Sequence, residues 1–299
     1  MNRSTANMIA HAQRVGSQVT VPDRILRLAE VQEHDVLGSP VLVIRPRPDV
    51  LAASDADARC PVHLIYLHGG GFVLPIAPPH WAILESLLLT TGATITVPLY
   101  PRAPEHTYVS TYEFLDEIYS LVTADLEPGG IIVLAGDSAG GGLAIGLAIR
   151  LKEAHQPPPA AIIAFSPWVD LSLTNAEIAG LERRDPVLVV SALIGAGELW
   201  AGETDVTHPL LSPVHADLSG MPPLYIYQGG RDIMLPDVMT LTRNMATAGG
   251  DVEVRIFPAG SHLFISAIRT PESKKAVRHA AATIKRLARK NRSRIAQTL

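Results

Sequence analysis

The stretch IIVLAGDSAGGG, residues 131–142, decides how this chain folds. Its first five residues form an apolar run of strand length, and the segment that follows Ser138 has helical character. Residues 136–140, between the two, spell GxSxG. A serine at such a tight turn is held in a strained backbone conformation, and its small neighbours avoid steric clashes. The stretch therefore predicts a strand, a sharp turn that presents the Ser138 hydroxyl at the edge of a sheet, and a helix.

Outward from this turn, short apolar runs alternate with longer segments of helical period. The alternation predicts one α/β domain over residues 1–299, with a mostly parallel central sheet of about eight strands flanked by helices. The first two runs flank a turn signal at 37–39, so we expect them to pair as an antiparallel hairpin at the sheet edge. The expected strands are Ile25–Val31, Val41–Arg45, Val62–Leu67, Thr94–Pro98, Ile131–Ala135, Ala161–Phe165, Leu224–Gln228 and Val252–Phe257.

Several longer segments have the spacing of helices that flank these strands. The segment that begins at Ala139 carries four glycines between residues 140 and 146. Each glycine costs about 1 kcal/mol relative to alanine inside a helix. Such a cluster needs a reason in close packing or ligand approach, so this turn is the first place to look for chemistry. The expected helices are Trp81–Leu89, Val109–Ala124, Ala139–Glu153, Val187–Trp200, Pro236–Ala248 and Glu272–Lys290.

A second glycine-rich turn, HGGGF at residues 68–72, follows the strand expected at Val62–Leu67. Consecutive glycines let backbone N–H groups approach a ligand without interference from side chains, as an oxyanion hole requires. A plain turn and a phosphate-binding loop are the alternatives. No lysine followed by serine or threonine closes the loop, as a P-loop requires, so the oxyanion hole is favoured.

A serine nucleophile needs a base, and the base needs a carboxylate that fixes its tautomer. Asp232 lies just past the expected strand Leu224–Gln228, and His262 lies just past Val252–Phe257. Because the carboxyl ends of parallel strands meet at one edge of a sheet, Ser138, Asp232 and His262 can converge there. Their order along the chain, Ser-Asp-His, is the one expected for a serine at this type of turn.

Other acids and histidines are weaker candidates for these roles. Asp237 follows a proline and is expected in the first turn of a helix, where a carboxylate complements the helix dipole. Among the rival bases, His279 lies on the expected terminal helix, and His208 and His215 lie in a proline-rich connection. We therefore prefer Asp232 as the acid and His262 as the base.

The composition is that of a globular protein. Of 299 residues, 47% are hydrophobic and 18% are charged, which excludes intrinsic disorder over most of the chain. The net charge of −4 gives no reason to expect nucleic acid as a partner. The single cysteine, Cys60, cannot form an intramolecular disulfide, and neither a secretory signal nor 18 uninterrupted apolar residues occur. We expect a cytoplasmic protein without integral membrane association.

Other kinds of site have little support in the sequence. His63, His68 and His80 are conceivable metal ligands, but no HExxH motif or carboxylate cluster accompanies them. We therefore expect neither a metal nor an organic cofactor. After Glu272 the chain carries nine basic residues and no acidic one. Their spacing predicts a final helix with an apolar inner stripe and a solvated basic outer face.

Together these motifs resemble the hormone-sensitive-lipase-like branch of the α/β-hydrolase family. The similarity runs from about Val62 to Phe264, some two-thirds of the chain. The motifs that carry it are HGGGF at 68–72, YPRAPEH at 100–106, GDSAGG at 136–141, SPWVDLS at 166–172, GGRD ending at Asp232 and GSH ending at His262.

The resemblance implies roles for three sets of residues. The catalytic set has Ser138 as nucleophile, His262 as base and Asp232 as the acid that orients the base. A second set would bind the oxyanion through backbone N–H groups, namely those of Gly70, Gly71 and Ala139. A third set would shape the two turns without taking part in proton transfer, and it consists of His68, Gly69, Gly136, Asp137 and Gly140.

The sequence departs from the family pattern in four places. Residues 100–103 read Tyr-Pro-Arg-Ala where a tyrosine-arginine-leucine run is usual, and IMLPD after the acid contains one extra residue. Leu263 replaces the commoner glycine after the base. Only about two dozen residues precede the first expected strand. We therefore expect a small helical cap from residues 1–24 and 180–218, and a more open or differently covered site.

The resemblance implies a serine carboxylic-ester hydrolase that acts on small-molecule esters with short to medium acyl chains. Lactones, amides and acetyl groups remain alternative substrates of the same triad. A non-catalytic small-molecule receptor on the same scaffold is the alternative from another class, and the presence of His262 argues against it. Members of this group often pair through the last strand, so a homodimer through Val252–Phe257 is a further expectation.

Overall fold

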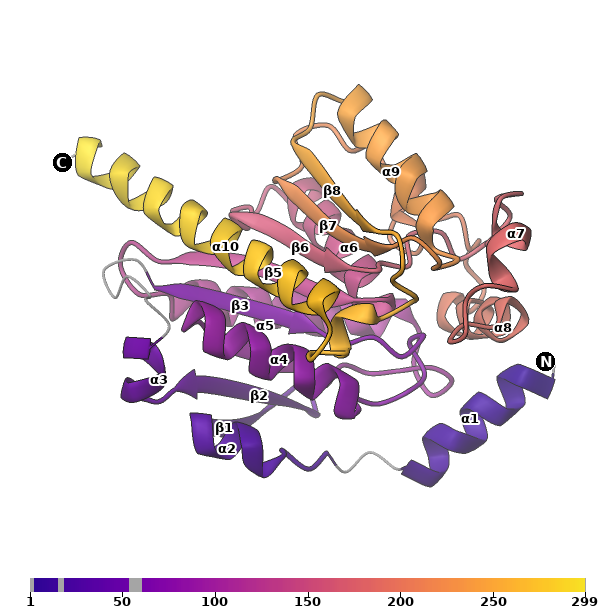
Figure 1. Cartoon of the computed structure of the whole chain (residues 1–299), viewed down its shortest axis with the longest axis horizontal. Helices are drawn as coiled ribbons and strands as arrows, with labels where there is room; N and C mark the ends of the chain where they lie inside the picture. The colour runs from indigo at the N-terminus through magenta and orange to yellow at the C-terminus, as the bar shows by residue number, and fades with distance from the viewer. Residues whose placement is uncertain (1–2, 16–18, 54–60, 299) are drawn as a thin grey trace.

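In residues 3–15, 19–53 and 61–298, which the computed structural model describes, the centre is an eight-stranded sheet (Figure 1). The strands are β1 (Ala29–Val36), β2 (Ser39–Pro46), β3 (Val62–Leu67), β4 (Thr94–Pro98), β5 (Ile131–Asp137), β6 (Ala161–Phe165), β7 (Leu224–Gly229) and β8 (Val252–Phe257). Their order across the sheet is β1-β2-β4-β3-β5-β6-β7-β8. β2 is antiparallel to both of its neighbours, and all other neighbours are parallel.

The central strands are buried on both faces, as parallel strands covered by helices must be. Every residue of β5 and β6 is buried. Four of the expected strands, at 62–67, 94–98, 161–165 and 252–257, have the observed bounds. β5 continues two residues past its expected end, because Gly136 and Asp137 still pair with β6. The predicted α/β architecture with a mostly parallel sheet is confirmed.

The expectation of a strand at Ile25–Val31 is wrong over its first half. Residues 25–28 belong to α2 (Asp23–Leu28), and β1 starts only after them. A proline precedes this helix and an aspartate opens it, which favours a helical first turn. Ile25 is fully buried in an apolar core, so its apolar character reflects burial from a helix. The expected hairpin of β1 and β2 does form.

Helices cover both faces of the sheet and enclose two apolar cores. The helices expected from the sequence are α4 (Pro78–Thr91), α5 (Tyr108–Ala124), α6 (Ala139–Glu153), α8 (Val190–Ala201), α9 (Leu235–Thr247) and α10 (Pro271–Thr298). Side chains of α5, α6 and α9 fill one core, and side chains of α4 and α10 fill the other. In Figure 1, α10 runs across the near face of the sheet. Only α6 has the expected bounds, because helix ends depend on local caps.

The sequence analysis gives no bounds for α2 or for three further α-helices among the described residues, namely α1 (Arg3–Val15), α3 (Pro48–Ala53) and α7 (Ile178–Glu182). α1 packs against α8 near the carboxyl ends of the central strands, on the right of Figure 1. A side chain at Gly195 of α8 would overlap Thr5 of α1, so the two helices approach closely there. α1 and α8 lie within the two ranges, 1–24 and 180–218, from which a cap is expected.

Three further expectations concern the periphery of the fold. Cys60 lies outside the described residues. β8 is the outer strand of the sheet, and Ile256 on it is exposed, but a homodimer through this edge stays a prediction. Of the helices within 3–15, 19–53 and 61–298, none combines the length and the apolar character needed to cross a bilayer.

Candidate active site

Ser138 forms a sharp turn between β5 and α6. Its backbone angles, φ 52° and ψ −124°, lie where residues with a side chain are strained. The turn is held by hydrogen bonds on both sides: the Ser138 N–H donates to the Phe165 carbonyl (2.9 Å), and the Ser138 carbonyl accepts from Gly141 (3.0 Å) and Trp168 (2.9 Å). The surrounding backbone therefore keeps the strained residue in place, as a nucleophile turn requires.

The glycines of this turn are required by close backbone approach. A side chain at Gly140 would overlap the carbonyl oxygen of Leu67, at the end of β3. One at Gly136 would overlap the carbonyl of Gly140, and one at Gly69 would overlap the Asp137 carboxylate. The ends of β3, β5 and α6 can therefore meet only if these positions lack a side chain.

The structure brings the three predicted side chains together in one hydrogen-bonded chain. His262 Nδ1 lies 2.9 Å from Asp232 Oδ2, and His262 Nε2 lies 2.9 Å from Ser138 Oγ. All three residues are buried, with 5% of Ser138, 0% of Asp232 and 4% of His262 exposed. In this arrangement Nδ1–H donates to the carboxylate, and the serine hydroxyl donates to Nε2. The imidazole can therefore accept the serine proton.

The environment of His262 favours its protonated form. Burial acts to lower the pKa of His262, but the charge and hydrogen bond of Asp232 outweigh it, with smaller contributions from Asp185 and Asp137. The pKa of His262 is therefore raised above its ordinary value. An imidazolium formed when His262 takes a proton is stabilised in this site.

The acid loop after β7 is held by backbone N–H groups. Asp232 Oδ1 accepts from the Met234 N–H (2.9 Å), which leaves Oδ2 for His262. The neighbouring Ile233 N–H donates to Asp185 Oδ2 (3.2 Å), 48 residues away along the chain. The sequence analysis does not single out Asp185. No local pattern could have found it, because the contact joins two loops of different elements.

The rival acid, Asp237, does not take part in this chain of hydrogen bonds. It lies in the first turn of α9, as expected, and is only 3% exposed. Burial raises the pKa of Asp237 to about 6, against a hydrogen bond from Asn175 that lowers it. One of its oxygens has no hydrogen-bond partner within the described residues.

Leu263, the residue after His262, has a left-handed backbone conformation with φ 55° and ψ 25°. Glycine adopts such a conformation without steric cost, which accounts for the commoner residue at this position of the family. Here the loop keeps the left-handed turn despite the leucine side chain. Leu263 therefore does not prevent His262 from making its hydrogen bonds to Asp232 and Ser138.

We call residues 68–74, which follow β3, the candidate oxyanion loop. It has three successive residues with positive φ: Gly70 (119°), Gly71 (61°) and Phe72 (62°). The Gly70 carbonyl accepts hydrogen bonds from Val73 (3.2 Å) and Leu74 (2.9 Å), so the loop closes on itself. Within the described residues, the N–H groups of Gly70, Gly71 and Ala139 donate no backbone hydrogen bond outside regular helices and strands. Free N–H groups at these positions are what an oxyanion hole needs.

The His68 side chain packs within this loop. Its Nδ1–H donates to the Gly69 carbonyl (2.7 Å), and its ring stacks on Tyr100 with centroids 4.6 Å apart. Burial, together with the nearby His80, lowers the pKa of His68 to about 3, so the ring is neutral at physiological pH. The Tyr100 hydroxyl donates to the His68 carbonyl (2.6 Å).

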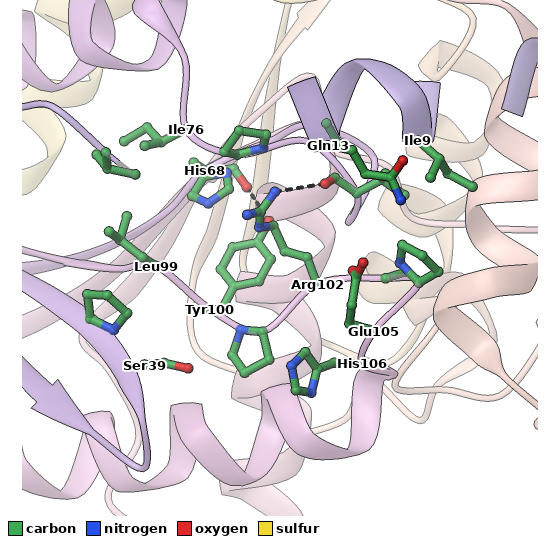
Figure 2. A pocket seen from close by; sticks show the side chains of 18 of the residues that line it. Ile9, Gln13, Ser39, His68, Ile76, Leu99, Tyr100, Arg102, Glu105 and His106 are labelled. Atoms are coloured by element: carbon green, nitrogen blue, oxygen red, sulfur yellow. Dashed lines mark hydrogen bonds between the residues drawn. The ribbon is translucent and has the colours of Figure 1, made fainter. Parts of the chain in front are cut away.

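The YPRA segment at residues 100–103 is hydrogen-bonded to the candidate oxyanion loop. The Arg102 guanidinium donates to the Val73 carbonyl (2.8 Å), and the Ala103 N–H donates to the Phe72 carbonyl (2.9 Å). Figure 2 shows Arg102 and Tyr100 in a cavity of about 450 Å³ that α1 borders through Ile9 and Gln13. Neither Ser138 nor His262 lines this cavity. The cavity therefore borders the loop at His68 and Val73 but does not include the candidate nucleophile.

Asp137 holds the turn through two neighbours. One carboxylate oxygen accepts a hydrogen bond from the Tyr66 hydroxyl (2.5 Å), and the other lies 3.5 Å from His80 Nε2. His80 Nδ1 accepts from the Ala77 N–H (2.8 Å), so its proton lies on the nitrogen that faces Asp137. Asp137 therefore links β5 to β3 and α4.

The three histidines considered as metal ligands do not form a metal site among the described residues. His63 lies apart from the loop, with Nε2 2.7 Å from Thr96 Oγ1. Burial, helped by Arg45, lowers the pKa of His63 to about 4.

The candidate oxyanion loop also contacts the helices α1 and α8. The ring of Phe72 stacks on Trp200 of α8, with centroids 4.6 Å apart and an interplanar angle of 5°. A side chain at Gly71 would lie 3.8 Å from Met8 of α1 and 3.9 Å from Ala196 of α8. A side chain at Gly71, one of the candidate oxyanion donors, would therefore be in van der Waals contact with both helices.

Comparison with known proteins yields consistent matches. Residues 64–266 match the model of a family described as alpha/beta hydrolase fold. The chain is 34% identical over 201 residues to an acetyl-hydrolase of Streptomyces hygroscopicus, covering 67% of each chain. It is 30% identical over 223 residues to esterase LipU of Mycobacterium tuberculosis, covering 72% of this chain and 74% of LipU. A crystal structure of an esterase from the bacterial hormone-sensitive lipase family has a TM-score of 0.78 at 25% identity, covering 96% of this chain and 99% of that chain.

Proposed function

Because this chain belongs to the alpha/beta hydrolase fold family, in its hormone-sensitive-lipase-like branch, we propose that it hydrolyses carboxylic esters with Ser138, His262 and Asp232 as catalytic triad. The observation that carries the proposal is the continuous chain of two 2.9 Å hydrogen bonds from Ser138 through His262 to Asp232. The names of the relatives, an acetyl-hydrolase and an esterase, support the same reaction type.

In the first half-reaction, the Ser138 hydroxyl attacks the ester carbonyl while His262 Nε2 accepts its proton. A bond forms between Oγ and the carbonyl carbon, and the carbonyl electrons move onto oxygen. The N–H groups of Gly70, Gly71 and Ala139 would bind this oxyanion, helped by the positive end of the α6 dipole. Protonated His262 then gives its proton to the leaving alcohol as the ester C–O bond breaks.

In the second half-reaction, water attacks the acyl-enzyme with His262 again accepting a proton. The acid is released when the bond between Ser138 Oγ and the acyl carbon breaks and protonated His262 returns its proton to Oγ, which restores the free enzyme. Asp232 keeps Nδ1 protonated and oriented through both steps, and it stabilises the imidazolium. The raised pKa of His262 supports this role.

Short to medium acyl chains are the proposed substrate class. Two observations support a limited space in front of Ser138: the serine is only 5% exposed, and α1 and α8 approach the candidate oxyanion loop at Gly71. We propose that α1 and residues 180–218 act as the cap of a single hydrolase domain. The acetyl-hydrolase among the relatives supports small acyl groups. Lactones and amides remain alternatives that the same triad could cleave.

The test is turnover of nitrophenyl esters from acetate to palmitate by the wild-type protein and by Ser138→Ala and His262→Ala. Each variant should lose on the order of 10⁴-fold or more in kcat, because the triad acts as a unit. Ser166→Ala is the matched control. Ser166 is also buried with positive φ directly after a strand, but its hydroxyl has no hydrogen-bond partner within the described residues.

The outcomes separate the alternatives. Activity on short esters that persists in Ser166→Ala and is lost in both triad variants supports the proposal. Full turnover by Ser138→Ala would overturn the mechanism. No turnover of any ester by folded wild-type protein that still binds an acyl ester would favour a narrow amidase or a receptor.

A further inference from the structure

Asp185 is a buried carboxylate in the segment between α7 and α8, and it is only 7% exposed. Its Oδ1 accepts hydrogen bonds from the N–H groups of Val187 (2.9 Å) and Leu188 (3.3 Å). Its Oδ2 accepts from the N–H of Ile233 (3.2 Å). The partners that hold this charge are therefore backbone N–H groups on two separate segments.

The two contacts of Oδ1 are those of an ordinary aspartate turn, in which the side chain caps the backbone two and three residues ahead. That local role does not account for Oδ2. An exposed aspartate performs the same turn elsewhere: Asp205 Oδ1 accepts from the Thr207 N–H (2.8 Å). Asp185 differs because it is buried and because its second oxygen reaches a loop 48 residues away.

That loop is the one that carries the triad acid. Ile233 directly follows Asp232 and is fully buried. Its N–H is held by Asp185, while the Asp232 carboxylate is held by the next N–H, that of Met234. Two consecutive anchors therefore fix the backbone and the carboxylate of the acid. A shift of this loop would move Oδ2 of Asp232 relative to His262.

The charge of Asp185 also acts on the base. The groups that face His262 are Asp232 from the loop after β7, Asp185 from the segment before α8, and Asp137 from the end of β5. All three are acidic. A second carboxylate near the Asp232–His262 pair favours the imidazolium that forms when His262 takes the serine proton.

We propose that Asp185 is a positioning residue for the Asp232–His262 pair, and that it ties the segment before α8 to the acid loop. The proposal rests on the proposed function, because it assigns Asp185 to the support of that triad. If the segment before α8 moves, the hydrogen bond from Ile233 to Asp185 breaks and Asp232 shifts relative to His262. Because this segment belongs to the proposed cap, the position of the cap and the alignment of the triad are coupled.

The test compares Asp185→Asn with wild type and with Asp205→Asn. The amide keeps one acceptor oxygen but turns a donor toward backbone N–H groups, and it removes the charge. We expect kcat/KM for a short nitrophenyl ester to fall about 10–100-fold through kcat, as small displacements of a catalytic group do. The acid limb of the pH profile should move to lower pH. Asp205→Asn should stay within about twofold of wild type, because it breaks only an exposed turn.

A second readout does not need turnover. NMR titration of the His262 ring should give a lower midpoint in Asp185→Asn than in wild type, and an unchanged midpoint in Asp205→Asn. If the wild-type protein hydrolyses no ester, the proposed function fails, yet a lowered midpoint still supports the link between Asp185 and the pair. Equal activity and equal midpoints in Asp185→Asn and Asp205→Asn overturn the proposal.

If Asp185→Asn does not fold, Asp185→Glu carries the test. It keeps the charge but displaces the carboxylate by one methylene in a buried site. The expected result is a kcat/KM at least threefold below wild type, with the His262 midpoint still raised. Wild-type kcat/KM in Asp185→Glu overturns the positioning role.

Discussion

The loop after β7 and the first turn of α9 each bury an aspartate, and the two aspartates are five residues apart. Their carboxylates differ in how completely they are hydrogen-bonded. Asp232 lies 2.9 Å from His262 Nδ1 and accepts a second hydrogen bond from Met234. Asp237 is almost as buried, but one of its oxygens lacks a partner within the described residues, and Asp170 lies near enough to add to the rise of its pKa to about 6.

The difference teaches that burial alone does not make a catalytic acid. Both carboxylate oxygens of Asp232 have a hydrogen-bond partner, the Met234 N–H for one and His262 Nδ1 for the other. Without enough partners, burial makes the charged form unfavourable, as at Asp237. The environment of Asp232 suits a carboxylate that must stabilise an imidazolium. The environment of Asp237 lowers the stability of the folded protein at pH values where this carboxyl is ionised.

The largest expected effect is on catalysis. Asp232→Asn should lower kcat for a short ester by about 10³–10⁴-fold, because the amide cannot keep the correct tautomer of His262. Asp237→Asn should leave kcat within about twofold. Both are measured with a nitrophenyl ester at pH 8. Equal losses in the two variants would mean that Asp237 also serves the base.

A smaller effect is expected in the pH dependence of kcat/KM, which should depend on His262 and not on Asp237. His262 must be neutral to accept the Ser138 proton, and its pKa is raised above the ordinary value of about 6.5. In wild type, kcat/KM should therefore fall about tenfold per pH unit below an apparent pKa that exceeds 6.5. Asp237→Asn should not move this limb. A limb centred below 6.5 in wild type would contradict the raised pKa of His262.

The smallest effect is on stability. The folded pKa of Asp237, about 6, lies above its ordinary value of 3.8, so its contribution to stability is present below pH 4 and is lost as pH rises through 6. Asp237→Asn should therefore raise the free energy of unfolding by on the order of 2 kcal/mol at pH 8 and by little at pH 4. Urea unfolding at both pH values measures this difference. The same change at both values would show that the carboxylate charge is not its cause.

The sequence predicted the bounds of several strands correctly from short apolar runs. The runs at 94–98 and 161–165 are strands with the expected bounds, because short apolar runs between turn signals fit strands buried between helices. The run at 252–257 also has the expected bounds, although only Phe257 of it is buried. Residues 25–28 show the converse. A short apolar run can pack into the core from a helix as well, and the proline and aspartate before it were the signal that favoured α2.

The sequence analysis expected helical cap elements within residues 1–24 but gave no bounds for α1. Met8, Ile9 and Ala12 have helical spacing and pack against an apolar core. The contact that places α1 beside α8, at Gly195, could not be read from either segment, because nothing local links Thr5 to a glycine 190 residues later. Long-range packing decides where an amphipathic helix docks.

The sequence by itself determined which residues could form a triad. GxSxG after a strand, and an acid and a histidine each just past later strands, are local features whose order was enough to select Ser138, Asp232 and His262. Local signals suffice there because a parallel sheet gathers its carboxyl strand ends at one edge.

Only the tertiary structure decided how those residues are supported. It placed α1 and α8 next to the candidate oxyanion loop, left one oxygen of Asp237 without a hydrogen-bond partner among the described residues, and brought Asp185 to the N–H of Ile233. These are contacts between segments far apart in the chain. Their strength depends on burial and on the geometry of single hydrogen bonds, which exist only once the chain has folded.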